Sequence, residues 1–262
     1  MSATTSNAQS IAPRWIARGL PYLYAAIAIG VVWQIVIWVS QPHPSILPPP
    51  WDVAVGFASL VASGEIFLHA GVSLARVTVA WLLSAAIAIP LGLAMGRSKS
   101  LERLVDPVIE LLRPISPLAW IPLAILWFGI SESGKVFIVF VGTFFPILLA
   151  TVSGVKGIDP VFIQAGQVMG TGSGFKLFRK VVLPAALPSI AVGLRISFGT
   201  GWAAIIAAEL VAARSGLGYL IANGMEILRA DQVLVGMIVI GVLGVCFDAF
   251  FRSLNKRFEW QS

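Results

Sequence analysis

Long apolar runs almost free of charge are the feature that most restricts what this chain can become. The first run, residues 20–39, is twenty residues long and contains no Asp, Glu, Lys or Arg. A helix rises 1.5 Å per residue, so about 20 apolar residues cross the ~30 Å hydrocarbon core of a bilayer. We expect five further spans, over residues 70–95, 118–130, 136–155, 185–210 and 233–251. The sequence therefore predicts an all-α integral membrane protein with six transmembrane helices.

Composition supports a membrane setting. Hydrophobic residues make up 58% of the 262 residues and charged residues only 11%, with a mean hydropathy of +0.90. Soluble domains carry roughly 25% charged residues, so this chain has too little polar surface to cover itself in water. The net charge of +6 comes from basic residues placed between the apolar runs. That placement indicates a lipid bilayer as the partner and argues against nucleic acid.

The same basic residues predict an orientation. Thirteen Lys and Arg fall in alternate breaks that include both ends of the chain, and three fall in the remaining breaks. Positive residues are retained in the cytoplasm, so we expect both termini inside. We expect a cytoplasmic tail at residues 1–19, a six-helix domain at residues 20–251 and a second cytoplasmic tail at residues 252–262. Within the domain, residues 40–69 should form a long external segment and residues 156–184 a long cytoplasmic one.

One stretch, GISESGKV at residues 129–136, resembles a phosphate-binding loop. Gly129, Gly134 and Lys135 match the Walker A spacing. Val136, however, stands where a Ser or Thr hydroxyl should reach Mg²⁺. The stretch also falls in a break that we expect outside the cell, away from ATP. We therefore expect a tight polar turn, with Lys135 reaching the lipid headgroups, and no nucleotide site in this chain.

Residues that bind metals are too sparse to form a recognisable site. Cys246 is the only cysteine, and His43 and His69 lie far apart and outside any H-E-x-x-H pattern. We expect the two histidines in loops or at interfaces. The sequence predicts that this chain binds neither a metal nor another cofactor.

The stretch between the fourth and fifth expected helices is the longest cytoplasmic break. Asp159 followed by Pro160 is typical of a helix start, and a short helix should run to about Met169. Gly170 and the glycines after it should end that helix. Apolar side chains mixed with a basic cluster would then be exposed at the membrane surface. They either dock a partner protein or lie on lipid, and physical reasoning alone leaves both open.

This segment resembles the EAA loop of ABC importer permeases, E-A-A-x3-G-x9-I-x-L-P. Here a Gln replaces the acidic residue, a Gly replaces the second Ala, and the spacer is one residue longer. Residues 106–135, 183–221 and 228–241 also resemble the taurine, aliphatic sulfonate, nitrate and bicarbonate permeases, the taurine type most. With residues 47–53, the resemblance covers roughly residues 45–258. The loop positions that match are Gln164, Ala165, Gly166 and Gly170, followed by Val181, Leu183 and Pro184.

The resemblance implies a type I ABC importer permease fold in the bacterial inner (plasma) membrane, with both termini cytoplasmic. It implies a homodimer of this chain, two ATPase subunits that bind ATP and Mg²⁺ inside, and a solute-binding protein outside. The implied function is a translocation path for a small organic or inorganic anion, such as taurine or another sulfonate. This chain would then have no ATPase site of its own and would not be an enzyme. The residues implied to couple to the ATPase are Gln164, Ala165, Gly166, Met169 and Gly170.

Ionisable residues inside expected spans are candidates for the translocation path. Arg195 either offers positive charge to an anion or pairs with a carboxylate. Arg76 lies about six residues from the outer end of its span and can snorkel there, or else it serves the path. Glu209 either lines an outer gate or pairs with Arg214. The candidate residues of the path or gate are Arg76, Arg195, Trp202 and Glu209.

Three further patterns concern packing. Asp248 should pair with Arg252, one helical turn away. The proline-rich run LLRPISPLAWIP is either a bent inner-gate segment or a plain break between helices. Gly193, Gly199 and Gly201 favour close helix approach, which is ordinary helix packing in most proteins and which we expect here at the dimer interface.

Two other classes of function would need sequence features that differ from those of an importer permease. A stand-alone secondary transporter often shows an internal repeat, and none is evident between the two halves. An intramembrane enzyme needs catalytic residues, and the sequence has neither H-E-x-x-H nor G-x-S-x-G. The sequence favours the permease and does not name its solute.

Overall fold

The computed structural model describes residues 14–172 and 174–255, and within these ranges it contains helices and connecting turns without a strand. Of the expected tails, residues 1–13 and 256–262 lie outside the described residues, as does Ser173. The helices are α1 (Arg14–Ser40), α2 (Pro50–Ala62), α3 (Glu65–Arg97), α4 (Lys99–Leu112), η1 (Pro117–Trp120), α5 (Ile121–Phe128), α6 (Glu132–Lys156), α7 (Pro160–Gly166), η2 (Gln167–Thr171), α8 (Phe175–Leu177), η3 (Phe178–Val182), α9 (Leu183–Ala212), α10 (Leu217–Glu226) and α11 (Ala230–Asn255).

The long helices confirm the all-α membrane fold. Among the described residues, α3, α6, most of α11 and the segment Phe175–Glu226, which contains α9, are long and apolar enough to cross a bilayer. Helix α4 and the pair η1–α5 meet at an 84° bend and would together make a fifth span. Within α1, Ile27–Ser40 is a shorter apolar helix. The count of six spans and the orientation of the termini therefore remain predictions.

Local start signals place two of the functional helices. The Asp159 carboxylate accepts a hydrogen bond from Val161 N at 2.8 Å and begins α7, as predicted. The Ser131 hydroxyl accepts from Gly134 N at 3.3 Å and begins α6. The Walker-like stretch is therefore the end of the α5–α6 connection followed by the capped first turn of a long helix. Ser133 and Gly134 lie in that helix, so the tight polar turn expected of them was wrong.

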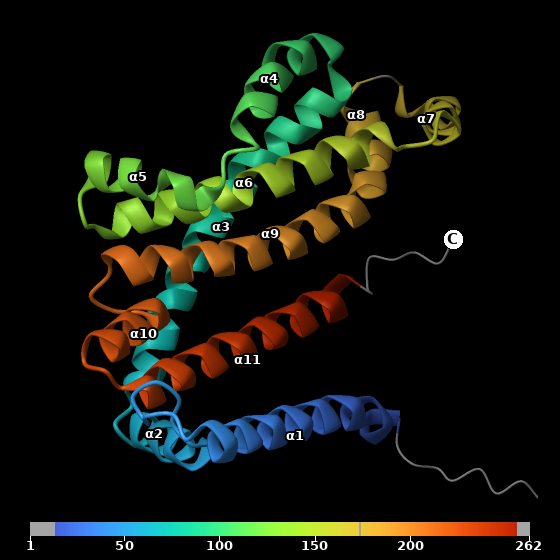
Figure 1. The fold of residues 1–262 in the computed structure, drawn as a ribbon. Helices are drawn as coiled ribbons and strands as arrows, with labels where there is room; N and C mark the ends of the chain where they lie inside the picture. Colours follow the sequence, from blue (N-terminus) through green and yellow to red (C-terminus); the bar gives the residue numbers. More distant parts are fainter. Residues whose placement is uncertain (1–13, 173, 256–262) are drawn as a thin grey trace, which may run out of the picture.

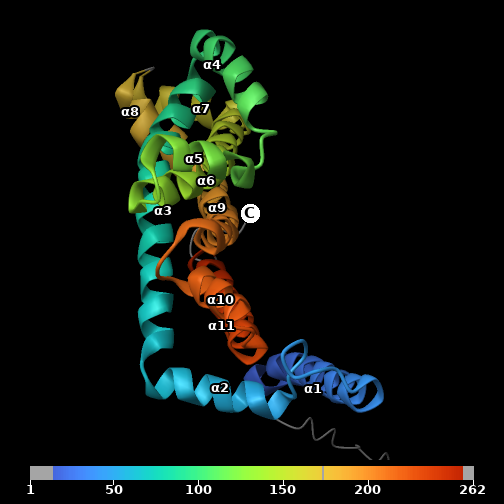
Figure 2. The same ribbon diagram turned by 60° about the vertical axis from the view of Figure 1, so that its left-hand side comes forward.

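Close packing joins α6 to its neighbours α3 and α9, which lie along it in Figures 1 and 2. A Cβ placed on Gly201 of α9 would lie 2.5 Å from Thr143 Cγ2 of α6, and one on Gly193 would overlap Ala150. Only glycine permits these crossings. The predicted close approach is thus confirmed, and at these two positions it is packing of α9 against α6 within the chain. A dimer interface involving these glycines stays a prediction. Gly199 has open space around it.

Different connecting segments lie at the two ends of the long helices. In Figure 1, α7 and α8 lie at the end where α6 finishes and α9 begins, and the carboxyl end of α11 points the same way. The α5–α6 turn and α10 lie at the opposite end. The segments predicted to be cytoplasmic therefore share one end, called the inner end below, and those predicted to be external share the other, the outer end.

Candidate functional site

At the inner end, the coupling segment (residues 156–184) is built around one glycine turn. Regular helix in α7 stops at Gly166 and continues as the wider π-helical turn η2. Gly170 ends it with φ +84°, and Gly172 follows with φ +64°. Both lie in the left-handed region that favours glycine. The predicted break at Gly170 is confirmed, although the regular helix ends before Met169.

Large apolar side chains of this segment face outwards. Val168 is 89% exposed and Met169 is 85% exposed, and Phe175 beyond the turn is 74% exposed. Of the predicted coupling residues, Gln164, Ala165, Met169 and Gly170 are exposed and Gly166 is buried. The structure therefore gathers them on one short helix and turn, with no part of the described chain covering the apolar side chains.

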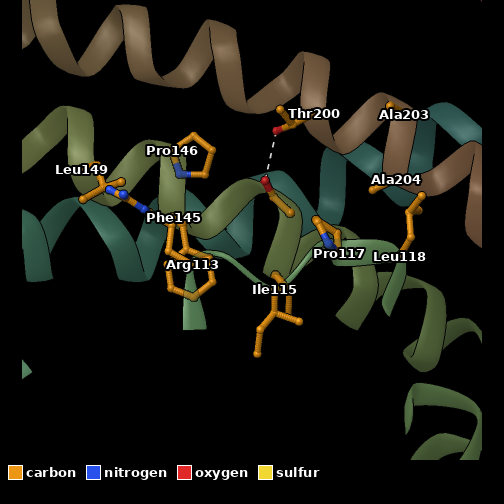
Figure 3. A pocket seen from close by; sticks show the side chains of 12 residues that line it. Arg113, Ile115, Pro117, Leu118, Phe145, Pro146, Leu149, Thr200, Ala203 and Ala204 are labelled. Carbon is orange, nitrogen blue, oxygen red and sulfur yellow. Dashed lines mark hydrogen bonds between the residues drawn. The ribbon is translucent and has the colours of Figure 1, made fainter. Parts of the chain in front are cut away.

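A groove of about 400 Å³ runs along the middle of the helices (Figure 3). Three segments build it: the bend between α4 and η1, the central part of α6, and α9. The bend is the proline-rich run, so that run does carry a sharp turn, as the bent-segment interpretation requires. The lining residues are Arg113, Ile115, Pro117, Leu118, Val141, Gly142, Phe145, Pro146, Leu149, Thr200, Ala203 and Ala204.

One wall of the groove contains a carbonyl freed by a proline. Pro146 has no N–H, so the carbonyl of Gly142, four residues earlier in α6, loses its helical donor. The Thr200 hydroxyl of α9 lies 3.0 Å from that oxygen and can donate to it, as Figure 3 shows. The groove wall therefore contains a carbonyl and a hydroxyl at this point, and these two groups hydrogen-bond to each other within the chain.

At the outer end, a buried carboxylate is held by three donor groups. Arg76 of α3 and Glu209 of α9 form an ion pair at 2.8 Å, with side chains 7% and 0% exposed. The Ser73 hydroxyl lies 2.7 Å from one Glu209 oxygen and 2.9 Å from the other, and Gly218 N donates at 3.0 Å. Glu209 pairs with Arg76 and not with Arg214, and Arg76 is buried and does not snorkel, so both expectations were wrong.

The same cluster extends to α6 and the α9–α10 turn. Arg76 donates to both carboxylate oxygens of Glu132 at 2.5 and 2.7 Å, and to the Ser215 carbonyl at 2.6 Å. Lys135 is buried and donates to Glu132 at 2.6 Å, so it does not reach for headgroups as expected. We call His69, Ser73, Arg76, Glu132, Lys135, Glu209 and Ser215 the outer network.

The histidines differ in setting. His69 lies inside α3, buried, and its Nδ1 accepts a hydrogen bond from Gly216 N at 3.1 Å. The loop alternative for His69 is therefore wrong, and its contact belongs to the outer network. His43 is exposed in the α1–α2 connection, and its Nδ1 accepts from Ser45 N. The described residues contain no group of three or more His, Cys, Asp or Glu arranged to hold a metal ion.

The other two path candidates lie elsewhere on α9. Arg195 pairs with Asp248 of α11 at 2.7 Å, which is the carboxylate alternative. Asp248 also pairs with Arg252 at 2.6 Å, so that prediction is confirmed. Trp202 lies beside Arg195 in a small pocket of about 50 Å³ and donates to the Ile240 carbonyl. The four candidates thus form two separate groups, and none of them lines the groove.

Sequence reasoning missed the partners that complete these sites. Ser73 and Glu132 approach Glu209 and Arg76 from 136 and 56 residues away in the chain. Thr200 approaches Gly142 from 58 residues away. Ser73 and Thr200 are ordinary residues in apolar runs, and Glu132 lies in the short polar break between two runs, so the sequence carries no local signal for their partners. The proline at position 146 was the one available hint, because it predicts a free carbonyl four residues earlier.

Comparison with known proteins gives this arrangement a family. A family model described as binding-protein-dependent transport system inner membrane component matches residues 88–260. An Escherichia coli permease protein named for aliphatic sulfonates transport is 40% identical over 243 residues, 93% of this chain and 92% of that protein. The taurine transport system permease protein of Escherichia coli is 36% identical over 231 residues, 86% of this chain and 84% of that protein.

A third relative widens the range of named solutes. The bicarbonate transport system permease protein of Synechococcus elongatus is 35% identical over 192 residues, 73% of this chain and 69% of that protein. The family match, these identities and the membrane helices agree with one another. The chain therefore belongs to the binding-protein-dependent transport system inner membrane components, the permease subunits of ABC transporters.

Proposed function

We propose that this permease forms the path by which a small anion enters the cell, and that a separate ATPase drives it through the coupling segment. The substrate class rests on the relatives, whose names refer to taurine, aliphatic sulfonates and bicarbonate. Each of these solutes carries an anionic group with several oxygens. The proposed path is the central groove, closed on its open side by a second copy of the chain.

The observation that supports ATPase docking is the exposure of Val168 and Met169, at 89% and 85%. Their helix begins at a capped start and ends at a left-handed glycine, so the segment has a defined shape. Exposed apolar side chains on a shaped surface indicate a protein partner or lipid. Gln164 beside them offers an uncharged hydrogen bond, in place of the acidic contact of the family pattern. ATP and Mg²⁺ would be bound by the ATPase.

The outer network has a different proposed role. Its central carboxylate is buried and its hydrogen bonds are made within the chain, so we propose that it fastens the α9–α10 turn at the outer gate. Arg195 and Trp202 would brace α9 against α11. On this proposal the four path candidates of the sequence are structural supports of the path, and the groove carries the solute.

The docking proposal is tested with Met169→Asp and a matched control, Ile46→Asp. Ile46 is 77% exposed and lies in the α1–α2 connection, at the predicted external side. We expect Met169→Asp to reduce co-purification of the ATPase and solute-stimulated ATP hydrolysis, because a charge must be desolvated in the apolar contact. Ile46→Asp should leave co-purification unchanged. Equal co-purification for both variants would favour lipid contact instead.

A second experiment separates the importer from a stand-alone secondary transporter. Proteoliposomes with the permease alone are compared with proteoliposomes containing permease, ATPase, binding protein and internal ATP. The proposal predicts uptake only in the second preparation. Uptake by the permease alone, driven by an ion gradient, would overturn it.

A further inference from the structure

Arg113 is the one charged residue among the twelve that line the groove. It follows the last turn of α4 and precedes the bend into η1. The backbone there places it opposite Phe145, Pro146 and Leu149 of α6. Its surroundings in the groove are therefore mostly apolar.

The guanidinium of Arg113 has no hydrogen-bond or ion-pair partner among the described residues, and the residue is exposed. Other cations associated with the long helices differ. Arg76 and Lys135 are paired with carboxylates, and Arg195 is paired with Asp248. Because Arg113 is exposed, its guanidinium donors stay free for an anion that enters the groove. Arg113 is thus a cation for which the described chain supplies no anion.

The chemistry of a guanidinium matches the proposed solutes. Its fixed fork of N–H donors binds two oxygens of a planar or tetrahedral anion at once. The groove volume of about 400 Å³ lies in the range of small-molecule sites, roughly 300–1,000 Å³. Thr200 on the opposite wall already has carbonyl partners for its single hydrogen. That leaves Arg113 as the side chain of the groove that can recognise an oxyanion.

We propose that Arg113 is the anion-binding residue of the groove and selects for oxyanions such as sulfonates and bicarbonate during passage. This inference rests on the proposed function, since it assigns the recognition of the anion within the same path. Selection within the permease would add to whatever the external binding protein selects.

The first test is uptake by the complete transporter in proteoliposomes. Radiolabelled taurine, ethanesulfonate and bicarbonate are the probes. We expect Arg113→Ala to lower uptake about 10- to 100-fold, because it removes a charge-assisted contact. Arg113→Lys should retain an intermediate rate, since it keeps the charge without the fork. The matched control is Arg103→Ala, which removes an exposed arginine from α4, the helix that Arg113 follows, away from the groove.

The second test measures the electrostatic potential in the groove and does not depend on transport. A cysteine is placed at Ala203, a lining residue, in a Cys246→Ser background because Cys246 is exposed. The rate of reaction with an anionic sulfonate-bearing thiol reagent is divided by the rate with a cationic reagent. Removing a nearby positive charge should lower this ratio about 3- to 10-fold in Arg113→Ala. Arg103→Ala should leave the ratio unchanged.

The two tests separate failure of the inference from failure of the proposed function. Suppose the wild type takes up a probe, and Arg113→Ala and Arg103→Ala take it up equally well. The role given to Arg113 would then be wrong, and the importer proposal would stand. If the wild type imports none of the three anions, the proposed substrate class is wrong, and the labelling ratio alone decides whether Arg113 attracts anions. An unchanged labelling ratio would show that Arg113 does not attract anions into the groove. Loss of the dimer in Arg113→Ala would make Arg113 an interface residue. Either result would overturn the proposal.

Discussion

The inner and outer ends of the α6–α9 pair treat polar and apolar groups in opposite ways. At the outer end, charged side chains from three helices are buried, and Glu209 is held by Arg76, Ser73 and Gly218. At the inner end, Val168 and Met169 are almost fully exposed although they are apolar. The outer end therefore buries charged side chains that are paired within the chain, whereas the inner end exposes apolar side chains to the surroundings.

Under the proposed function, this difference separates an end held together within the chain from an end that docks a partner. The outer network joins α3, α6, α9 and α10 through hydrogen bonds and ion pairs. Removing Arg76 would leave the buried carboxylate of Glu209 without a counter-charge, which is strongly destabilising. The apolar side chains of the coupling segment gain their favourable contacts only when something covers them. We therefore expect the outer end to be sensitive to mutation through stability, and the inner end through coupling to the ATPase.

Arg76→Ala should have the largest effect and act on stability. It leaves the fully buried Glu209 without a cation among the described residues, which costs about 3–5 kcal/mol. Glu209→Ala should cost less, about 1–3 kcal/mol, because Arg76 keeps both hydrogen bonds to Glu132. Unfolding of the purified permease in mixed detergent micelles, followed by its helical signal, measures both.

The control for this prediction is an exposed pair. Lys156 and Glu102 form an ion pair with side chains 48% and 24% exposed. Lys156→Ala should change stability by no more than about 1 kcal/mol. If Glu209→Ala destabilised the protein more than Arg76→Ala, the claim that Glu132 still satisfies Arg76 in the absence of Glu209 would be wrong.

Gly170→Trp should have the next largest effect and act on coupling. We expect it to weaken ATPase association by about 1–3 kcal/mol, because a large side chain holds the docked surfaces apart. Gln164→Ala should weaken it less, since it removes one neutral contact. Co-purification of the ATPase with the permease is the measurement.

Backbone strain must be separated from docking in that experiment. Gly64 has φ +79°, close to the +84° of Gly170, and a Cβ on either residue would meet open space. Gly64→Trp therefore carries the same strain at the predicted external side. Similar losses of ATPase for the two variants would show that strain, and not the docking surface, explains the effect.

Lys135→Ala should have the smallest effect. Glu132 is 64% exposed and keeps its two hydrogen bonds from Arg76, so losing Lys135 leaves no buried charge alone. We expect ATP-driven uptake to stay within about twofold of wild type, since an exposed carboxylate loses under about 1 kcal/mol. A loss as deep as that of a Walker A lysine variant would contradict the assignment of this stretch as a capped helix start.

The sequence predicted features that are repeated or local, and missed those that depend on distant residues. Long apolar runs predict long helices because a bilayer leaves backbone groups no other partner. Asp159 and Gly170 act within one helical turn, so their roles were visible. The pairing of Glu209 was not, because Arg76 lies 133 residues away and Arg214 lies five positions away. Proximity in sequence favoured the wrong partner.

Helices in the expected connections were missed for a related reason. Helix α4 lies in a charged stretch with alternating apolar residues, where no long apolar run exists, and α2 lies in the expected external segment. The groove could not be predicted at all. Its lining comes from three segments whose approach depends on glycine contacts, such as Gly201 with Thr143.

Photo-crosslinking of the intact transporter tests the central claim most directly. A photoreactive amino acid is placed at Val168 in one sample and at Ile46 in another, both highly exposed. Val168 follows α7 at the inner end, and Ile46 lies in the α1–α2 connection on the predicted external side. We expect Val168 to crosslink to the ATPase subunit and Ile46 not to. Lipid adducts alone at Val168, or ATPase crosslinks from Ile46, would contradict the assignment of the coupling segment as the docking surface.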